Sequence, residues 1–170
     1  DAIVQVVRCF QNDNVVHVAG KVDPLSDISV IQTELALADL NTVERVIQRE
    51  IKKAGAGNKE SARLCELLEK VAAHLNKAEP VRSQGLDKEQ MELIRPLCLI
   101  TAKPTMYVAN VSDDGFTDNP LLDQLTQYAE SQNAPIVTIC AAIESEIVEL
   151  PEEDRAEFLS DMGMEEPGLN

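Results

Sequence analysis

Two long stretches of helical periodicity interrupt this chain between residues 28 and 79. From residue 28 to about residue 54, apolar side chains recur three or four positions apart, which predicts a helix about 40 Å long at 1.5 Å per residue. Residues 54–58 contain two glycines and end this helix, and the same period resumes over residues 64–78. We predict a projecting antiparallel helical hairpin, a coiled-coil arm, and an ordinary core hairpin is the alternative.

Strand-like runs lie on both sides of the hairpin. Residues 3–9 are apolar on both faces, which is typical of a central parallel strand, and residues 106–109 and 136–140 are two further short apolar runs. A short extended piece is expected at residues 15–18. Further helices are expected at residues 89–94 behind an Asp87 cap, behind Asn119-Pro120, at residues 142–148, and from residue 151 to near residue 163.

The order strand, helical insertion, strand, helix, strand, helix predicts an α/β fold. It is typical of a parallel sheet wound with right-handed crossovers, which would form one α/β domain. Residues 1–27 and 87–170 are predicted to form that domain, with an acidic helix at its end, and residues 28–86 the inserted hairpin.

The net charge of −15 is unevenly distributed. Residues 111–170 hold fifteen acids and the single base Arg155, whereas residues 1–110 are nearly neutral. The acidic half disfavours binding to DNA, although a solvated face that aids solubility explains it more simply. The chain has no apolar run of about 18 residues that would predict a membrane span. A reduced, cytoplasmic setting without zinc or disulfides is expected from four widely spaced cysteines: Cys9, Cys65, Cys98 and Cys140.

A polar loop follows the strand that ends near residue 109. Asn110 and Asp113 stand three residues apart on it, and a second loop with small side chains follows the next strand at residues 140–142. Because ligands bind at the carboxyl ends of parallel strands, the loops should lie side by side and read a purine base. Asp113 would accept hydrogen bonds from the base edge, while Cys140, Ala141 and Ala142 would let backbone amides approach it. A simple turn at residues 110–115 is the alternative.

The phosphate-binding half of such a site is missing from these residues. No Gly-x-x-x-x-Gly-Lys-Ser/Thr loop occurs, and no catalytic or metal-binding residue is predicted. Because phosphoryl transfer needs a phosphate cradle and a metal, we expect the 170 residues alone to hydrolyse no nucleotide. The chain begins at Asp1 and enters a strand at once, so we expect it to be a piece of a longer protein.

The hairpin tip, residues 44–63, is basic within an acidic chain. An RNA backbone or a protein partner could bind there. Favourable interaction of basic residues with a helix C-terminus is the alternative explanation. The candidate partner-binding residues are Arg45, Arg49, Lys52, Lys53, Lys59 and Arg63.

Several motifs resemble one family in order and spacing. They are residues 10–14 (Phe-Gln-Asn-Asp-Asn), 17–24 (His-Val-Ala-Gly-Lys-Val-Asp-Pro), 33–40 (Thr-Glu-Leu-Ala-Leu-Ala-Asp-Leu), 103–111 (Lys-Pro-Thr-Met-Tyr-Val-Ala-Asn-Val) and 165–170 (Glu-Glu-Pro-Gly-Leu-Asn). The chain resembles the Obg-like ATPase family, also called YchF or ribosome-binding ATPase. The resemblance implies a P-loop domain with a helical insertion and a later TGS domain. It also implies ATP as ligand, Mg²⁺ held by segments outside this chain, and the ribosome or its RNA as partner.

The resemblance also bears on base preference. Asn110 matches the first position of the family's altered Asn-Lys-x-Asp motif, and Val111 stands where GTPases have Lys. Asp113 stands where the family usually has Glu and is similar to the guanine-reading carboxylate of GTPases. ATP preference is therefore expected from Val111, while Asp113 leaves GTP open. A non-catalytic interaction module, docking through its hairpin, is the remaining alternative.

Overall fold

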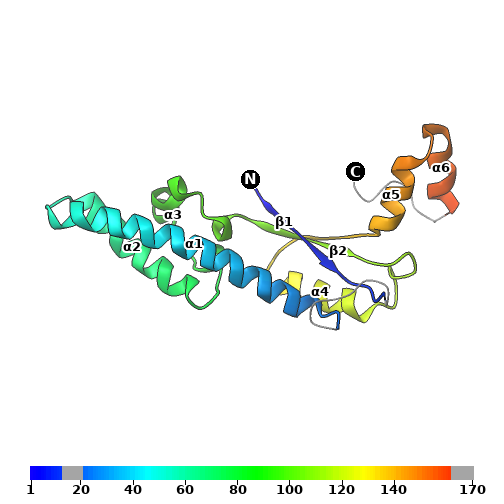
Figure 1. Cartoon of the computed structure of the whole chain (residues 1–170), viewed down its shortest axis with the longest axis horizontal. Helices are drawn as coiled ribbons and strands as arrows, with labels where there is room; N and C mark the ends of the chain where they lie inside the picture. The colour runs from blue at the N-terminus through cyan, green and yellow to red at the C-terminus, as the bar shows by residue number, and fades with distance from the viewer. Residues whose placement is uncertain (13–20, 162–170) are drawn as a thin grey trace. The chain divides into compact units, whose positions relative to one another are not determined.

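The computed structural model describes residues 1–12 and 21–161. The extended piece expected at residues 15–18 and the motif at residues 165–170 lie outside the described residues. The elements in chain order are β1 (Ile3–Arg8), α1 (Pro24–Gly55), α2 (Lys59–Leu75), α3 (Lys88–Ile94), β2 (Thr105–Asn110), α4 (Pro120–Ser131), β3 (Ile136–Ile139), α5 (Ala141–Glu149) and α6 (Glu152–Asp161), with 3₁₀ turns at Val81–Ser83, Arg95–Leu97 and Ile100–Ala102 (Figure 1).

The chain falls into two compact units. One comprises Asp1–Ile3 and Ile28–Pro104, and the other comprises Val4–Asp27 and Thr105–Asn170. The long segment of the first unit begins at Ile28 and ends at Pro104. It continues beyond residue 86 because Ile94 and Leu99 belong to the same apolar core as the hairpin.

The second unit is built on a sheet with the strand order β1-β2-β3. β2 pairs parallel to β3, with Tyr107 opposite Ile136 and Asn110 opposite Ile139. The residues of β2 alternate between buried and half-buried, as is usual for a strand whose sheet is covered by helices. The predicted α/β fold with a parallel sheet is therefore confirmed.

Strand β1 differs from its prediction. It has one hydrogen-bonded neighbour in the described sheet, β2, and it is not central. Val4 and Val6 leave 54% and 64% of their surface exposed, whereas Val7 is buried. The apolar run was interpreted as covered on both faces, but within residues 1–12 and 21–161 only one face is covered, and a run of valines does not reveal which face has a neighbour.

Helices α1 and α2 form the predicted hairpin of the first unit and run alongside each other (Figure 1). Their spacing of apolar residues buries one face of each helix. The turn follows the glycine signal, since Gly57 adopts a φ of +94° that favours glycine. The shared core contains Ala36, Leu40, Val43, Leu67, Leu68, Val71 and Leu75, joined by Val81, Ile94 and Leu99.

A buried carboxylate joins three segments of the first unit. Asp39 of α1 accepts hydrogen bonds from the backbone N–H groups of Ile100 (2.9 Å) and Thr101 (2.7 Å), and from the Thr101 hydroxyl (2.7 Å). The same hydroxyl oxygen accepts from the Val81 N–H at 3.2 Å. Three segments far apart in sequence are thus joined through two side chains, which satisfies donors that burial would otherwise leave unpaired.

Candidate functional site

The two predicted loops meet at the carboxyl end of the sheet. Because β2 and β3 are parallel and in register at Asn110 and Ile139, the segments that follow them emerge at the same edge. The Asn110 side-chain Oδ1 accepts a hydrogen bond from the Ala141 N–H at 3.0 Å. The structure therefore brings Asn110 together with residues 140–142.

The side chains in these loops differ in accessibility. Val111 is only 2% exposed and its N–H donates to the Ile139 carbonyl at 2.9 Å, so it extends the β2–β3 pairing by one residue. Cys140 is buried as well, whereas Ala141 and Ala142 are exposed at the start of α5. Neither Val111 nor Cys140 presents its side chain to a ligand, and their contribution to a site would come from the backbone.

The segment after Val111 is a tight turn that leaves its carboxylates outside. The Gly115 N–H donates to the Ser112 carbonyl at 3.0 Å, and the Ser112 hydroxyl donates to Asp114 Oδ1 at 2.8 Å. A Cβ on Gly115 would lie 2.8 Å from Ser112 Oγ and 3.1 Å from the Ser112 backbone N, so a larger residue would displace the hydroxyl and crowd the backbone of the turn. Asp113 is exposed and its Oδ1 accepts from the Asp114 N–H at 3.1 Å. The loop is a turn, as the alternative predicted, and it also presents Asp113.

Asn119 is a positioning residue that the sequence did not identify. Its Nδ2 donates to the carbonyls of Cys9 (2.8 Å) and Gly115 (2.9 Å). Its Oδ1 accepts from the N–H groups of Leu121 and Leu122, which caps α4. The Asn-Pro signal located the helix start, but no local pattern indicates the bond to Cys9, which is 110 residues away.

A hollow of about 430 Å³ lies beside this loop in the second unit. Cys9, Ser112, Asp114 and Asn119 are among the residues that line it, and Asn110 and Asp113 are not. Burial raises the pKa of the Cys9 thiol to about 11, so this thiol is protonated and unreactive at neutral pH. The hollow therefore lies next to the predicted base-binding loop, but Asn110 and Asp113 do not line it.

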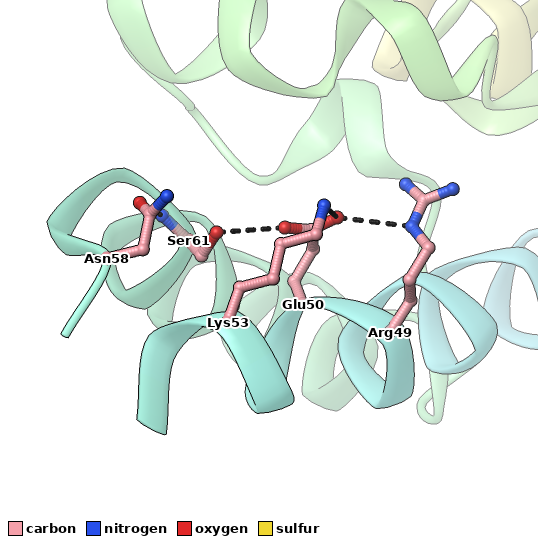
Figure 2. Close-up of polar contacts among 5 residues, drawn as sticks. All are labelled: Arg49, Glu50, Lys53, Asn58 and Ser61. Carbon is pink, nitrogen blue, oxygen red and sulfur yellow. Dashed lines mark hydrogen bonds and ion pairs between the residues drawn. The ribbon is translucent and has the colours of Figure 1, made fainter. Parts of the chain in front are cut away.

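A buried carboxylate organises the hairpin tip (Figure 2). Glu50 of α1, 5% exposed, accepts from the Ser61 hydroxyl of α2 at 2.9 Å. It also accepts from Lys53 Nζ at 2.9 Å and Arg49 Nε at 3.1 Å. The Lys53 and Ser61 hydrogen bonds lower the pKa of this carboxyl to about 2. Asn58 completes the tip by accepting from the Ser61 N–H at 3.0 Å.

The other basic residues of the tip have different surroundings. Arg63 pairs with Glu89 of α3 at 2.7 Å, and this contact raises the pKa of the guanidinium. Arg45 Nε donates to the Asn41 carbonyl on its own helix at 3.0 Å. Lys52 and Lys59 are exposed, and within residues 1–12 and 21–161 their side chains make no hydrogen bond or ion pair.

Two kinds of feature are absent from the described residues. None of the helices there is long and apolar enough to cross a membrane. No group of three or more His, Cys, Asp or Glu side chains there is arranged to hold a metal ion.

Comparison with known proteins gives close matches over the whole chain. It is 55% identical over 170 residues to the ribosome-binding ATPase YchF of Haemophilus influenzae, 51% identical over 170 residues to that of Escherichia coli O157:H7, and 43% identical over 173 residues to that of Bacillus subtilis. In each case the match covers 100% of this chain and 47% of the relative. No protein-family model matches the chain.

A solved structure agrees with these relatives. The Schizosaccharomyces pombe YchF GTPase superposes with a TM-score of 0.80 at 30% identity, covering 97% of this chain and 46% of that one. The chain thus spans about half the length of the proteins it matches. Its motifs, its inserted hairpin and these matches together show that these 170 residues belong to the YchF family.

Proposed function

We propose that the protein to which these residues belong hydrolyses ATP, with Mg²⁺ held by segments outside this chain, and associates with the ribosome in the cytoplasm. Its relatives are named ribosome-binding ATPases, and its structural neighbour is named a GTPase. In this proposal the second unit contributes recognition of the purine base and the hairpin contributes a docking arm. The 170 residues alone are expected to show no turnover, because they hold no phosphate-binding loop.

The hydrogen bond between Asn110 and Ala141 carries the base-binding proposal. It joins the two loops into one surface and holds the start of α5 against the end of β2. Cys140, the cap residue of α5, makes no side-chain cap. N–H groups in the first turn of a helix have no acceptor within that helix, so the N–H of the exposed Ala142 can donate to a base. Asp113 supplies an acceptor for the exocyclic or ring N–H groups of that base.

Calorimetric titration of the full-length protein with ATP and GTP tests this proposal. We expect tighter binding of ATP, and we expect Asp113→Asn to reduce the discrimination between the two nucleotides roughly tenfold, about 1.4 kcal/mol. Asp114→Asn is the matched control, because it neutralises the neighbouring exposed acid. Equal effects of the two substitutions would show that general charge, and not base contact, is responsible.

GTP preference is the second candidate, and the identity of Asp113 favours it. An aspartate at this position suits the two adjacent N–H donors of guanine, and the family usually has Glu here. If GTP binds more tightly and Asp113→Glu reverses the order, the protein is a GTPase and the ATP proposal is wrong. If Asp113→Glu changes neither affinity, side-chain length at this position does not set the preference.

The docking arm has its own test. The double substitution Lys52→Glu with Lys53→Glu in the full-length protein should weaken co-sedimentation with ribosomes and leave ATP affinity unchanged. Reversal of the tip charge repels a polyanion, and the tip lies outside the unit that holds the base loops. Unchanged sedimentation would remove the tip from the proposal.

A further inference from the structure

We propose that three of the six basic residues at the hairpin tip, Arg45, Lys52 and Lys59, form a contact surface for RNA phosphates, and that Glu50 withholds Arg49 and Lys53 from it. The proposal rests on the ribosome association proposed above and states which charges serve it. From sequence all six bases are equivalent. In the structure they divide by what they contact.

Glu50 keeps Arg49 and Lys53 paired with it because its own charge is buried. Its carboxyl has a pKa of about 2 and is ionised at neutral pH. If both Lys53 and Arg49 turned to a polyanion, this buried carboxylate would keep only the Ser61 hydroxyl as partner. Unpaired buried charge is unfavourable, so these bases stay with Glu50 when a polyanion approaches. Arg63 is instead neutralised by Glu89 in an exposed ion pair, so proximity and not burial reduces the charge that a polyanion meets there.

The helix dipole accounts for only one of the three remaining basic residues. Lys52 lies in the last turn of α1, where a positive charge is favourable, but Arg45 lies ten residues before the end of that helix. Lys59 is the first residue of α2, where a positive charge is unfavourable. None of the three contacts a carboxylate in the described part of the chain. Their charges are therefore available to a partner.

The placement of these charges fits a phosphate backbone. Arg45 and Lys52 are seven residues apart and share one face of α1, about 10 Å from each other at 1.5 Å per residue. Lys59 follows directly after the turn. The phosphates of RNA are evenly spaced negative charges, and exposed lysine and arginine side chains can bind them without a pocket. The tip, residues 44–63, carries +3 within a chain of −15, so it is the part of the sequence suited to such a partner.

The salt dependence of RNA binding tests the division. Full-length protein would be titrated with fluorescein-labelled poly(U) at several salt concentrations. Removing one phosphate contact to single-stranded RNA lowers the slope of log K against log salt by about 0.7. We expect this change for each of Arg45→Ala, Lys52→Ala and Lys59→Ala. The matched substitutions Arg49→Ala, Lys53→Ala and Arg63→Ala also remove one charge each and should leave the slope unchanged.

A second pair of variants tests the role of Glu50 directly. Glu50→Gln and Glu44→Gln each remove one negative charge, but only the first releases two paired bases. We expect Glu50→Gln to steepen the slope and raise poly(U) affinity more than Glu44→Gln does, with helical content by circular dichroism showing that the hairpin is retained. Equal effects of the two variants would overturn the proposal.

The remaining outcomes separate this proposal from the one on which it rests. If the unsubstituted protein binds neither ribosomes nor poly(U), the ribosome association itself is wrong. If it binds and all six alanine variants behave alike, binding follows total charge and the division is overturned. If Arg45, Lys52 and Lys59 matter for ribosome sedimentation but not for poly(U), the partner is an acidic protein and the RNA assignment is overturned.

Discussion

The hairpin unit and the loop after β2 use acidic side chains in opposite ways. In the hairpin unit Asp39 and Glu50 are buried and each accepts three hydrogen bonds. In the loop, Asp113 and Asp114 are exposed, and the neutral amide of Asn119 joins the surrounding segments. Buried carboxylates join the segments of the first region, whereas the carboxylates of the second are exposed and each accepts one local hydrogen bond.

This difference separates structural acids from candidate ligand-binding acids. An acid whose oxygens are all engaged has little capacity left for a ligand, and removing it leaves buried donors without acceptors. An exposed acid contributes little to stability and can be replaced at small cost. Replacing the buried acids Asp39 and Glu50 should therefore lower the free energy of unfolding. Replacing the exposed acids Asp113 and Asp114 should lower it less.

The largest loss of stability is expected for Asp39→Ala. It leaves the N–H groups of Ile100 and Thr101 and the Thr101 hydroxyl without an acceptor, which should cost about 3 kcal/mol. Hydrogen exchange of the full-length protein at residues 100 and 101 measures the local opening free energy. Glu34→Ala, at an exposed position on the same helix, is the control and should change it by less than about 0.5 kcal/mol. Comparable losses for both variants would contradict the buried role of Asp39.

Asn119→Asp should have the next largest effect. The substitution keeps the acceptor that caps α4 but replaces an amide donor by a carboxylate facing the carbonyl oxygens of Cys9 and Gly115. We expect a loss of about 2 kcal/mol and weaker nucleotide binding, because the loop that bears Asp113 loses its attachment.

Thermal unfolding and nucleotide titration of the full-length protein measure both effects of this substitution. Asn119→Ser retains a cap and serves as the comparison, with a smaller loss of stability expected. A stable Asn119→Asp protein with unchanged nucleotide affinity would show that the loop is held by other contacts.

Glu50 should make the hairpin sensitive to acid. Its folded pKa of about 2 lies below the ordinary value of 4.5, so the stabilisation is fully present above pH 4.5 and is lost as the pH falls towards 2. The difference in thermal midpoint between the unsubstituted protein and Glu50→Gln should therefore shrink over that interval. Circular dichroism of the helices follows it, and a difference that stays constant with pH would contradict the ionised carboxylate.

The smallest effect on stability is expected for Asp113→Ala. The carboxylate is exposed and accepts one local hydrogen bond from Asp114, so the change should lie within about 0.5 kcal/mol. Thermal unfolding of the full-length protein without nucleotide measures it. A loss comparable to that of Asn119→Asp would mean that Asp113 supports the turn and is not reserved for a ligand.

Local patterns predicted the elements of both regions well. Helical periodicity and the glycines at residues 54–58 located the hairpin and its turn, and Asp87 and Asn119 cap helices where they were expected to. These signals act within a few residues, so they can be read from sequence. The meeting of residue 110 with residues 140–142 was also predicted, since parallel strands end at one edge.

The contacts that distinguish the acids could not be predicted in this way. Thr101 is 62 residues from Asp39, and Asn119 is 110 residues from Cys9. Even the pairing of Glu50 with Ser61 depends on how two helices rotate against each other. Chemistry limits which groups can bond, but distance along the chain does not indicate which ones do. For the same reason, six similar bases at the tip could not be sorted before the structure.

Strand β1 has a practical consequence for handling this polypeptide. In the described residues it has a paired neighbour on one side only, and it exposes Val4 and Val6 on one face. An apolar strand with a free edge is a template for intermolecular sheet formation. At the concentrations used for crystallisation or NMR, an isolated preparation of these residues should oligomerise through residues 3–8. Replacing Val4 or Val6 with lysine should delay that self-association.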